Sequence, residues 1–343
     1  MSLANTVLLE YRKKYMRGGY DEYEHRATLA GAYEAYRKSN LTPGLQQELM
    51  NKKSQAQSVK VPSLTGGTVT IGSARSLTIA DTAITSAYAT LSWATIRSAF
   101  RMSPAINFSN EISYQDELFR KLDDLDLAWL DALDALAAAN LNTNKTGFIT
   151  ADGNPYTLTS DEIIVPYTER ENFFNEIDHI FKADKLPTMN MSIIGNTRMQ
   201  PLFKSISEFA VYNSQNKIAR LGNKELLISS NIAAETDYQY VGYAVAPNAL
   251  GFYNWNDPDA QLRSKAYNGE VMLFTLPRTG LTVAAFYVSA FADNSSSLTG
   301  GERSLVEYWE FSTDISWLTA FNSSPTTKAD PIMKFKIEKE ETN

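Results

Sequence analysis

The chain contains no cysteine among its 343 residues. This absence excludes disulfide bonds, zinc sites with thiolate ligands and a cysteine nucleophile, and it suits a protein made in a reducing cytoplasm. Only two histidines occur, His25 and His179, and because they lie in unrelated segments we expect no histidine-rich metal site. His179 stands beside Asp178, but we interpret it as a helix-surface residue and not as part of a catalytic dyad.

Long apolar runs are also missing. No stretch of about 18 apolar residues is present to span a membrane, and the start, MSLANTVLLEYRKKY, lacks the pattern of a secretory signal. Glycine-rich phosphate loops and the G-x-S-x-G nucleophile motif do not occur either. We therefore predict no catalytic residues, no cofactor, no metal and no membrane contact.

Charge is distributed unevenly along the chain. Residues 1–60 carry ten Lys or Arg and six Asp or Glu, whereas the whole chain has a net charge of −7. A basic arm on an acidic body is suited to docking on another copy's body or to approaching nucleic acid, although an imbalance without any role is equally compatible. The acidic body argues against sequence-specific DNA recognition, which requires a basic face.

The first forty residues predict two helices separated by Gly18 and Gly19. Tyrosine is frequent here, and Tyr11 and Tyr15 are four residues apart, so they share a helix face. Tyrosine is enriched at protein interfaces because it combines a large, stiff contact area with a polar tip. We expect an arm that reaches a neighbouring subunit; the alternative is a helical hairpin on the same subunit's core.

A segment of low charge follows. Residues 54–109 contain only five charged side chains, and VKVPSLTGGTVTIGSARSLTI and SAYATLSWATIRSAFRM alternate β-branched or apolar with polar residues around Gly66-Gly67. This pattern predicts a long two-stranded antiparallel ribbon. Because an isolated ribbon is marginal in water, we expect it to lie across an adjacent subunit or, alternatively, to fold back on its own.

Residues 110–140 predict one long helix of roughly 46 Å. An apolar stripe at spacings of three and four runs along it, formed by Leu118, Leu122, Leu125, Trp129, Leu133 and Leu136. The same helix carries the acidic residues Glu117, Asp123, Asp124, Asp126, Asp131 and Asp134. One straight helix presents carboxylates in a row and not around a cation, so we interpret this cluster as a solvated face or a surface for a basic partner.

The remainder mixes helices and strands, which predicts the α+β class. Helices are expected over residues 168–183 and 199–209, with a hairpin at Asp152-Gly153-Asn154-Pro155. The segment Asn254-Trp255-Asn256-Asp257-Pro258-Asp259 resembles a calcium loop but lacks the distal glutamate, so we interpret it as a turn. Strands are expected at residues 189–194, 225–229, 238–246, 271–276, 281–290, 305–311 and 332–337.

The order of these parts resembles the major capsid proteins of tailed bacteriophages, whose fold is shared with encapsulins and the floor of the herpesvirus capsid. NEISYQDELFRKLDDLDLAWLDALDAL resembles the family's spine helix, MNMSIIGNTRMQPLFKSISEF the entry into its axial domain, and VEYWEFSTDISWL with DPIMKFKIE its return strands. The resemblance implies an N-terminal arm (residues 1–57), an extended β-ribbon loop (58–106), a peripheral domain (107–188) with the spine helix at 110–140, an axial domain (189–300) and return strands of the peripheral domain (301–343).

The resemblance also implies a function for this chain. The resemblance implies a structural subunit that self-assembles into pentamers and hexamers of an icosahedral shell around double-stranded phage DNA, contacted non-specifically. It implies a virion protein assembled in the bacterial host cytoplasm, with possible partners in separate scaffolding, portal and decoration proteins. Because the arm begins near Met1, we expect no cleaved scaffolding segment, and we assign no residue to the covalent cross-link of some relatives.

Contacts between subunits are expected on the arm and the ribbon. The predicted contact residues are Tyr11, Tyr15, Tyr33, Leu64, Val69, Ile71 and Arg75. Three alternatives remain open: an encapsulin-like compartment of the same fold, a tail-tube or portal subunit, and a soluble enzyme with an unrecognised site.

Overall fold

The structure is a computed structural model of the chain. It describes residues 3–16, 29–39, 41–42, 44–51, 58–61, 87–102, 114–145, 156–184, 186–206, 210–213, 218–222, 224–256, 269–293, 303–320 and 331–340. Its helices are α1 (Leu3–Met16), α2 (Gly31–Lys38), α3 (Leu45–Asn51), α5 (Tyr114–Thr143), α6 (Phe173–Ala183) and α7 (Met199–Ser205), with a 3₁₀ turn at Tyr167–Glu169. Among these helices, none combines the length and the apolarity needed to cross a lipid bilayer.

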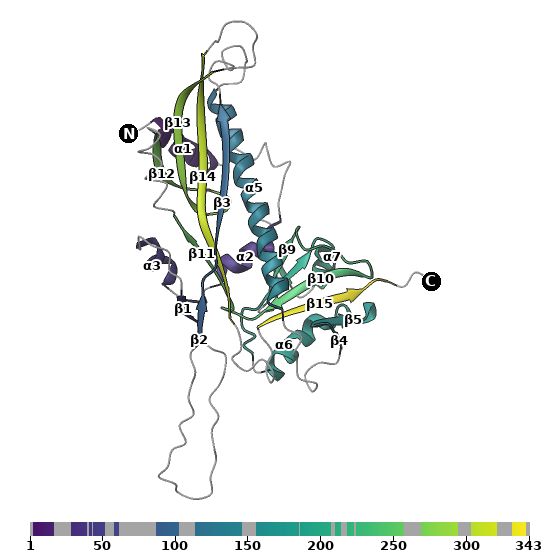
Figure 1. Cartoon of the computed structure of the whole chain (residues 1–343). Helices are drawn as coiled ribbons and strands as arrows, with labels where there is room; N and C mark the ends of the chain where they lie inside the picture. Colours follow the sequence, from purple (N-terminus) through teal and green to yellow (C-terminus); the bar gives the residue numbers. More distant parts are fainter. Residues whose placement is uncertain are drawn as a thin grey trace, which may run out of the picture.

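The long helix α5 runs beside one sheet and ends at the other (Figure 1). Its 30 residues correspond to about 45 Å. The predicted spine helix at 110–140 is therefore confirmed, shifted by a few residues. Leu118, Leu122, Leu125, Trp129 and Leu133 are buried as the stripe predicted, whereas Leu136 is 43% exposed and does not belong to the core. Leu136 lies on the same face as Leu118 and Leu125 but nearer the C-terminal end of the helix, where the described residues do not cover this face.

A larger sheet occupies the lower right of Figure 1. Its strand order is β4-β5-β15-β10-β6-β9-β8-β7, with parallel pairing between β5 and β15 and between β6 and β9. One face is covered by α6, where Phe173 and Phe174 lie 4.9 and 6.0 Å from Phe335 between ring centroids. The strands are β4 (Thr157–Thr159), β5 (Glu162–Val165), β6 (Ser192–Asn196), β7 (Ala210–Asn213), β8 (Ile218–Leu221), β9 (Lys224–Ser229), β10 (Tyr238–Val245) and β15 (Ile332–Glu338).

A second sheet is organised around the 17-residue strand β14 (Arg303–Thr319). Along its length β14 pairs antiparallel with β13 (Thr282–Asp293), β3 (Trp93–Met102) and β11 (Leu250–Trp255), and β12 (Glu270–Thr275) pairs with β13. Alternate residues of β14 point to the spine side, and Trp309, Phe311 and Ile315 are buried there. Over Phe311–Ser316 the residues of the opposite face, Ser312, Asp314 and Ser316, are buried too, so this part of β14 is enclosed on both faces.

The division into segments differs from the predicted one. Residues 93–102, predicted inside the extended loop, pair with β14 instead of with the other half of a ribbon. Strands β11 to β13, predicted in an axial domain at 189–300, belong to the β14 sheet, and β15, predicted to return to the peripheral domain, pairs with β10 and β5. Strand alternation indicates that a segment is a strand but does not identify its partner.

A small third sheet marks the start of the predicted ribbon. β1 (Ser58–Val61) pairs antiparallel with β2 (Ala87–Thr90), apart from both larger sheets (Figure 1). The predicted antiparallel pairing is confirmed over these residues, while the Gly66-Gly67 turn lies outside the described residues. The predicted turn at 152–155 also lies outside them, and the hairpin that is described, β4–β5, turns at Ser160 and Asp161 with φ of 50° and 64°.

Candidate assembly surfaces

The structure places two predicted contact residues in the core of their own subunit. Tyr11 on α1 is fully buried, and its ring lies 5.7 Å from Phe119 of the spine and 6.2 Å from Phe274 of β12. Tyr33 on α2 is 1% exposed and donates its hydroxyl to the carbonyl of Thr279 at 3.0 Å. Both helices of the arm therefore dock on the same chain, which corrects the prediction that these two side chains face a neighbour.

The other predicted contact residues keep the status of predictions. The side chain of Tyr15, and Leu64, Val69, Ile71 and Arg75 as whole residues, lie outside the described residues. Nothing in the described part of the chain tests whether they contact a second subunit.

The acidic residues of the spine helix do not form one solvated face. Asp123, Asp126 and Asp134 are 5%, 0% and 0% exposed, whereas Asp124 and Asp131 are exposed. Helical spacing does not separate the two groups, since Asp131 and Asp134 lie on adjacent parts of the helix surface and Asn231 donates to both. The predicted solvated face is therefore wrong for the three buried carboxylates, because distant segments of the chain supply donors to them.

Two of these carboxylates hold the turn between β12 and β13. Asp126 accepts backbone hydrogen bonds from Arg278 at 2.7 Å and Thr279 at 3.2 Å, and Asp123 pairs with the Arg278 guanidinium at 2.9 Å. Burial raises the pKa of Asp126 to about 6, although the N–H groups of Arg278 and Thr279 oppose the shift. The carbonyl oxygen of Thr279, in the same turn, accepts a hydrogen bond from the Arg37 guanidinium of α2 at 3.2 Å. The arm, the spine and the β14 sheet are thereby joined.

The third carboxylate, Asp134, holds the start of α2. Its Oδ1 accepts the backbone N–H groups of Ala32 and Tyr33 at 2.9 and 3.0 Å. These are the second and third residues of α2, whose N–H groups have no partner within the helix. Ala30 precedes the helix and provides no side-chain cap. Asp134 thus replaces the missing cap from a distant part of the chain.

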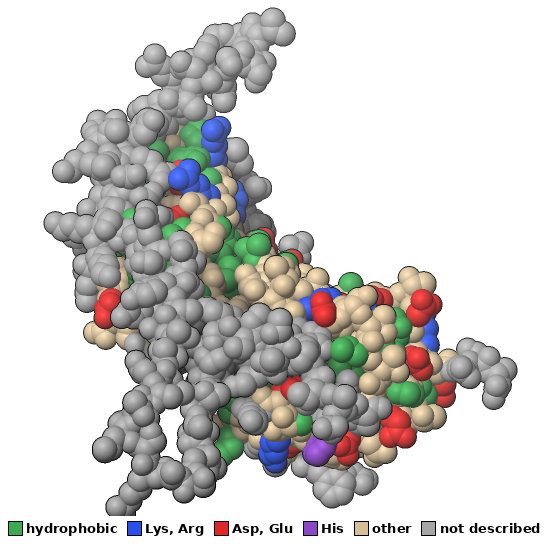
Figure 2. Space-filling view, turned by 60° about the horizontal axis from the view of Figure 1, so that its bottom comes forward, with side chains coloured by type: hydrophobic (Ala, Val, Ile, Leu, Met, Phe, Trp, Pro, Cys, Tyr) green, Lys and Arg blue, Asp and Glu red, His purple; other side chains and the backbone are tan. Residues whose placement is uncertain are grey.

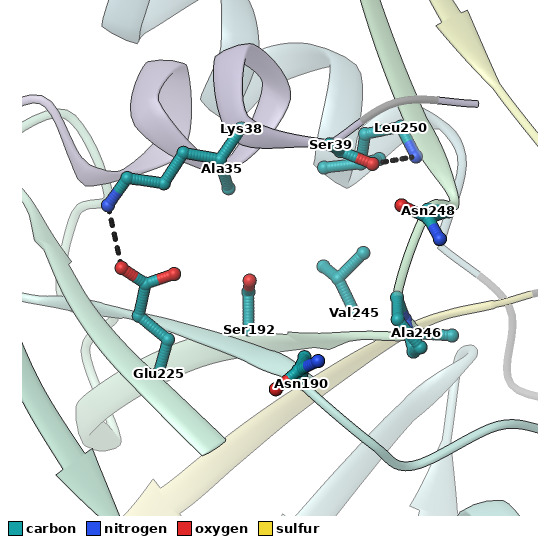
Figure 3. A pocket seen from close by; sticks show the side chains of 11 residues that line it. Ala35, Lys38, Ser39, Asn190, Ser192, Glu225, Val245, Ala246, Asn248 and Leu250 are labelled. Carbon is teal, nitrogen blue, oxygen red and sulfur yellow. Dashed lines mark hydrogen bonds and ion pairs between the residues drawn. The ribbon is translucent and has the colours of Figure 1, made fainter. Parts of the chain in front are cut away.

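Two cavities flank the C-terminal end of α2. The first, about 200 Å³, lies between α2, β6 and the connection from β10 to β11, and Lys38 and Glu225 pair across its rim at 2.6 Å (Figure 3). On its other side the Ser39 hydroxyl accepts the Leu250 N–H at 3.1 Å. The second, about 350 Å³, is lined by Arg37, Gln46, Tyr253 and Asn254 among others. The lining described for both cavities consists mainly of amides, hydroxyls and aliphatic groups.

Catalytic or metal-binding clusters are not found in the described part of the chain. His179 is exposed on α6, as the helix-surface interpretation predicted. Within the described ranges, no three His, Cys, Asp or Glu side chains come together in a way that suits a metal ion.

A cluster of ions spans the larger sheet. Glu162 on β5 pairs with Lys334 of β15 at 2.8 Å and, at close range, with Lys336 and Lys145, while Glu235 pairs with Lys334 at 3.2 Å and with Lys336. Burial alone would raise the pKa of Glu162, but hydrogen bonds from the three lysines lower it to about 2. Sequence reasoning missed this cluster, although K-F-K at 334–336 places two lysines on one strand face.

The outer surface combines apolar and charged areas. Leu273 on the edge strand β12 and Met189 are 65% and 74% exposed. Figure 2 shows acidic side chains spread over the right-hand part of the molecule, which contains the larger sheet. Basic side chains are visible near the top of the same view. Arg97 and Arg101 are exposed on β3, the outer strand of the β14 sheet.

The fold is similar to that of a solved phage capsid. The capsid of Ralstonia phage GP4 is 10% identical, with 90% of this chain and 92% of that chain covered and a TM-score of 0.51. A capsid structure of cyanophage P-SCSP1u is 10% identical (84% and 85% covered, TM-score 0.46), and one from Mycobacterium phage Che8 is 12% identical (87% and 91% covered, TM-score 0.48). No protein-family model and no curated protein matches the chain. The likeness to the GP4 capsid confirms the predicted α+β fold of tailed-phage capsid subunits.

Proposed function

We propose that this chain is the major capsid subunit of a tailed bacteriophage. Many copies form pentamers and hexamers, which close into an icosahedral shell that encloses double-stranded DNA in the virion. The role is structural and not enzymatic. The observation that carries the proposal is the shared fold with the capsid of Ralstonia phage GP4, which extends over 90% of this chain and 92% of that one.

The extended loop supports the proposal on physical grounds. β1 and β2 form a two-stranded sheet that hydrogen-bonds to neither of the larger sheets in the described structure. A pair of short strands is marginal in water by itself and is stabilised by packing on another surface. In a shell, the neighbouring subunit provides that surface. Separate scaffolding, portal and decoration proteins, and assembly in the host cytoplasm, are further parts of this proposal.

Electron microscopy and light scattering of the chain expressed alone, and then with the scaffolding protein of its own phage, test the proposal. Closed particles or rings with five- and six-fold symmetry are expected. DNA-filled particles in an infected host support a phage capsid, whereas an enzyme cargo inside supports a compartment of the same fold. A single ring symmetry without closed shells supports a tail-tube or portal subunit. A monodisperse monomer under all conditions contradicts the proposal and favours an enzyme.

A deletion separates the loop's role from folding. Removing residues 63–78, which lie outside the described residues, is expected to leave a folded subunit that fails to close shells. The matched control replaces the same residues by a Gly-Ser segment of equal length, which keeps the chain length and removes the side-chain contacts. If both variants fail to assemble and keep the wild-type circular dichroism spectrum, the loop side chains act between subunits. If the deletion unfolds the subunit, the loop belongs to its own core.

A further inference from the structure

The attachment of α2 to the spine depends on a buried carboxylate that has only neutral partners. Besides the N–H groups of Ala32 and Tyr33 on Oδ1, Asp134 accepts the Ser229 hydroxyl at 2.5 Å and the Asn231 amide at 3.0 Å on Oδ2. Asp134 is fully buried. Among the described residues it forms no ion pair, whereas Asp123 on the same helix pairs with Arg278.

A buried charge that lacks a cation is costly even when it is hydrogen-bonded. The positive end of the α2 dipole and the four donors offset part of this cost. Desolvation still outweighs them: burial raises the pKa of Asp134, against hydrogen bonds from Ser229, Asn231, Tyr33 and Ala32. When α2 is undocked, the Ala32 and Tyr33 donors are lost and water reaches the carboxylate, which then titrates near its ordinary value.

We propose that docking of α2 on the spine helix is linked to uptake of a proton at Asp134, so that the N-terminal arm is held more firmly in acidic than in neutral solution. At pH values between the pKa of Asp134 in the undocked state and its higher pKa in the docked state, the docked state binds more protons. Lowering the pH therefore favours docking. At pH values above the docked-state pKa of Asp134, protonation no longer contributes to docking.

The geometry has a place for the proton. The Ser229 hydroxyl oxygen already accepts the backbone N–H of Asn231 at 3.2 Å and lies 2.5 Å from Oδ2 of Asp134. A proton taken from solvent onto Oδ2 can be donated to this oxygen when the hydroxyl hydrogen turns away. Oδ1 keeps both of its bonds from α2. Docking is thus compatible with the neutral acid, and the charge is what opposes it.

Other charged groups act on this junction. On the spine, Asp131 accepts a bond from Asn231 at 3.1 Å and favours the neutral form of Asp134, as does Asp126. On α2, Arg37 points to Thr279 at 3.2 Å, and Arg278 of the β12–β13 turn pairs with Asp123; both cations favour the charged form. The pKa of Asp134 is raised on docking because, among the described residues, no cation pairs with it directly.

Hydrogen exchange of the full-length chain, measured by mass spectrometry from pH 5 to 8 on peptides covering residues 31–38, tests the proposal. After correction for intrinsic exchange rates, protection of α2 is expected to rise as the pH falls, by at most about tenfold per pH unit for one proton. Asp134→Asn keeps an Oδ1 acceptor and does not titrate, so its protection should rise less than that of the wild type as the pH falls; any rise that remains comes from other groups, such as Asp126. Asp124→Asn, which removes an exposed carboxylate of the same helix, is the matched control and should keep the wild-type slope.

Two results overturn the proposal: wild-type protection that is equal at pH 5 and pH 8, or an Asp134→Asn profile with the wild-type slope. If Asp134→Asn does not fold, the wild-type and Asp124→Asn profiles decide, since a flat wild-type profile refutes the linkage by itself. The measurement needs only the single chain, so its outcome is independent of whether the chain builds shells.

Discussion

Replacement of Glu162 by glutamine gives the clearest test of what stabilises the larger sheet. Glu162 is 8% exposed and accepts bonds from Lys145, which follows α5, and from Lys334 and Lys336 on β15. Glutamine keeps the shape but carries no charge, so three lysines, two of them largely buried, lose their main counter-ion. Removing one partner of a buried ion cluster lowers the free energy of unfolding more than replacing the whole cluster by apolar residues does, because it leaves buried charges without a counter-ion.

The magnitude follows from the pKa of Glu162. The three lysines lower it from an ordinary value of 4.5 to about 2. One unit of pKa corresponds to about 1.4 kcal/mol, so the ionised carboxylate contributes about 3 kcal/mol to the free energy of unfolding. Because the pKa is lowered in the folded state, this contribution is complete above about pH 4.5 and is lost as the pH falls toward 2. Glu162→Gln should therefore cost about 3 kcal/mol at pH 7 and progressively less below pH 4.5.

Urea unfolding of the unassembled subunit measures this difference. All five tryptophans lie on α5, β3, β11 or β14, so their fluorescence reports on the other sheet; far-UV circular dichroism follows both sheets. The control is Glu171→Gln, a glutamate that is 57% exposed and lies 3.8 Å from Arg170, for which we expect less than about 0.5 kcal/mol. Equal stability of Glu162→Gln and wild type from pH 3 to 7 would refute the reasoning.

Four further variants test the packing around the spine. Trp129→Ala removes a side chain that is 2% exposed and should lower the free energy of unfolding by about 3–5 kcal/mol. Leu136→Ala, at a position that is 43% exposed, should change it by less than about 0.5 kcal/mol, and urea titrations compare the two. Gly31→Ala places a Cβ 2.6 Å from the Ile228 carbonyl oxygen, so α2 must move away from β9, and faster hydrogen exchange in residues 31–38 is expected. Arg278→Ala leaves the Asp123 carboxylate buried without its cation, and we expect a cost of about 3 kcal/mol, read from thermal unfolding; an unchanged midpoint would contradict this.

Local patterns were sufficient to predict many of the elements. The three- and four-residue spacing of leucines predicted the spine helix, and alternation predicted strands close to β9, β10, β12, β13 and β15. These signals are short-range, because a helix or strand that buries one face must repeat its apolar residues with the period of its backbone. β11 was missed, since Asn254 and the acidic residues after it indicated a turn, although the preceding L-G-F-Y contains aromatic strand formers.

Only the tertiary structure decided which segments pair and which charges are buried. β3 has the same alternation whether it pairs with a ribbon partner or, as here, with β14, because alternation carries no information on the partner. Asp124 and Asp134 are alike in sequence, yet one is exposed and the other is enclosed by donors from α2 and from the end of β9, about a hundred residues away in the chain on either side. Tyr11 and Tyr33 likewise show the composition of an interface but are buried by their own subunit. Whether a polar or aromatic side chain meets solvent, its own core or a neighbour depends on long-range contacts, and a local pattern does not contain them.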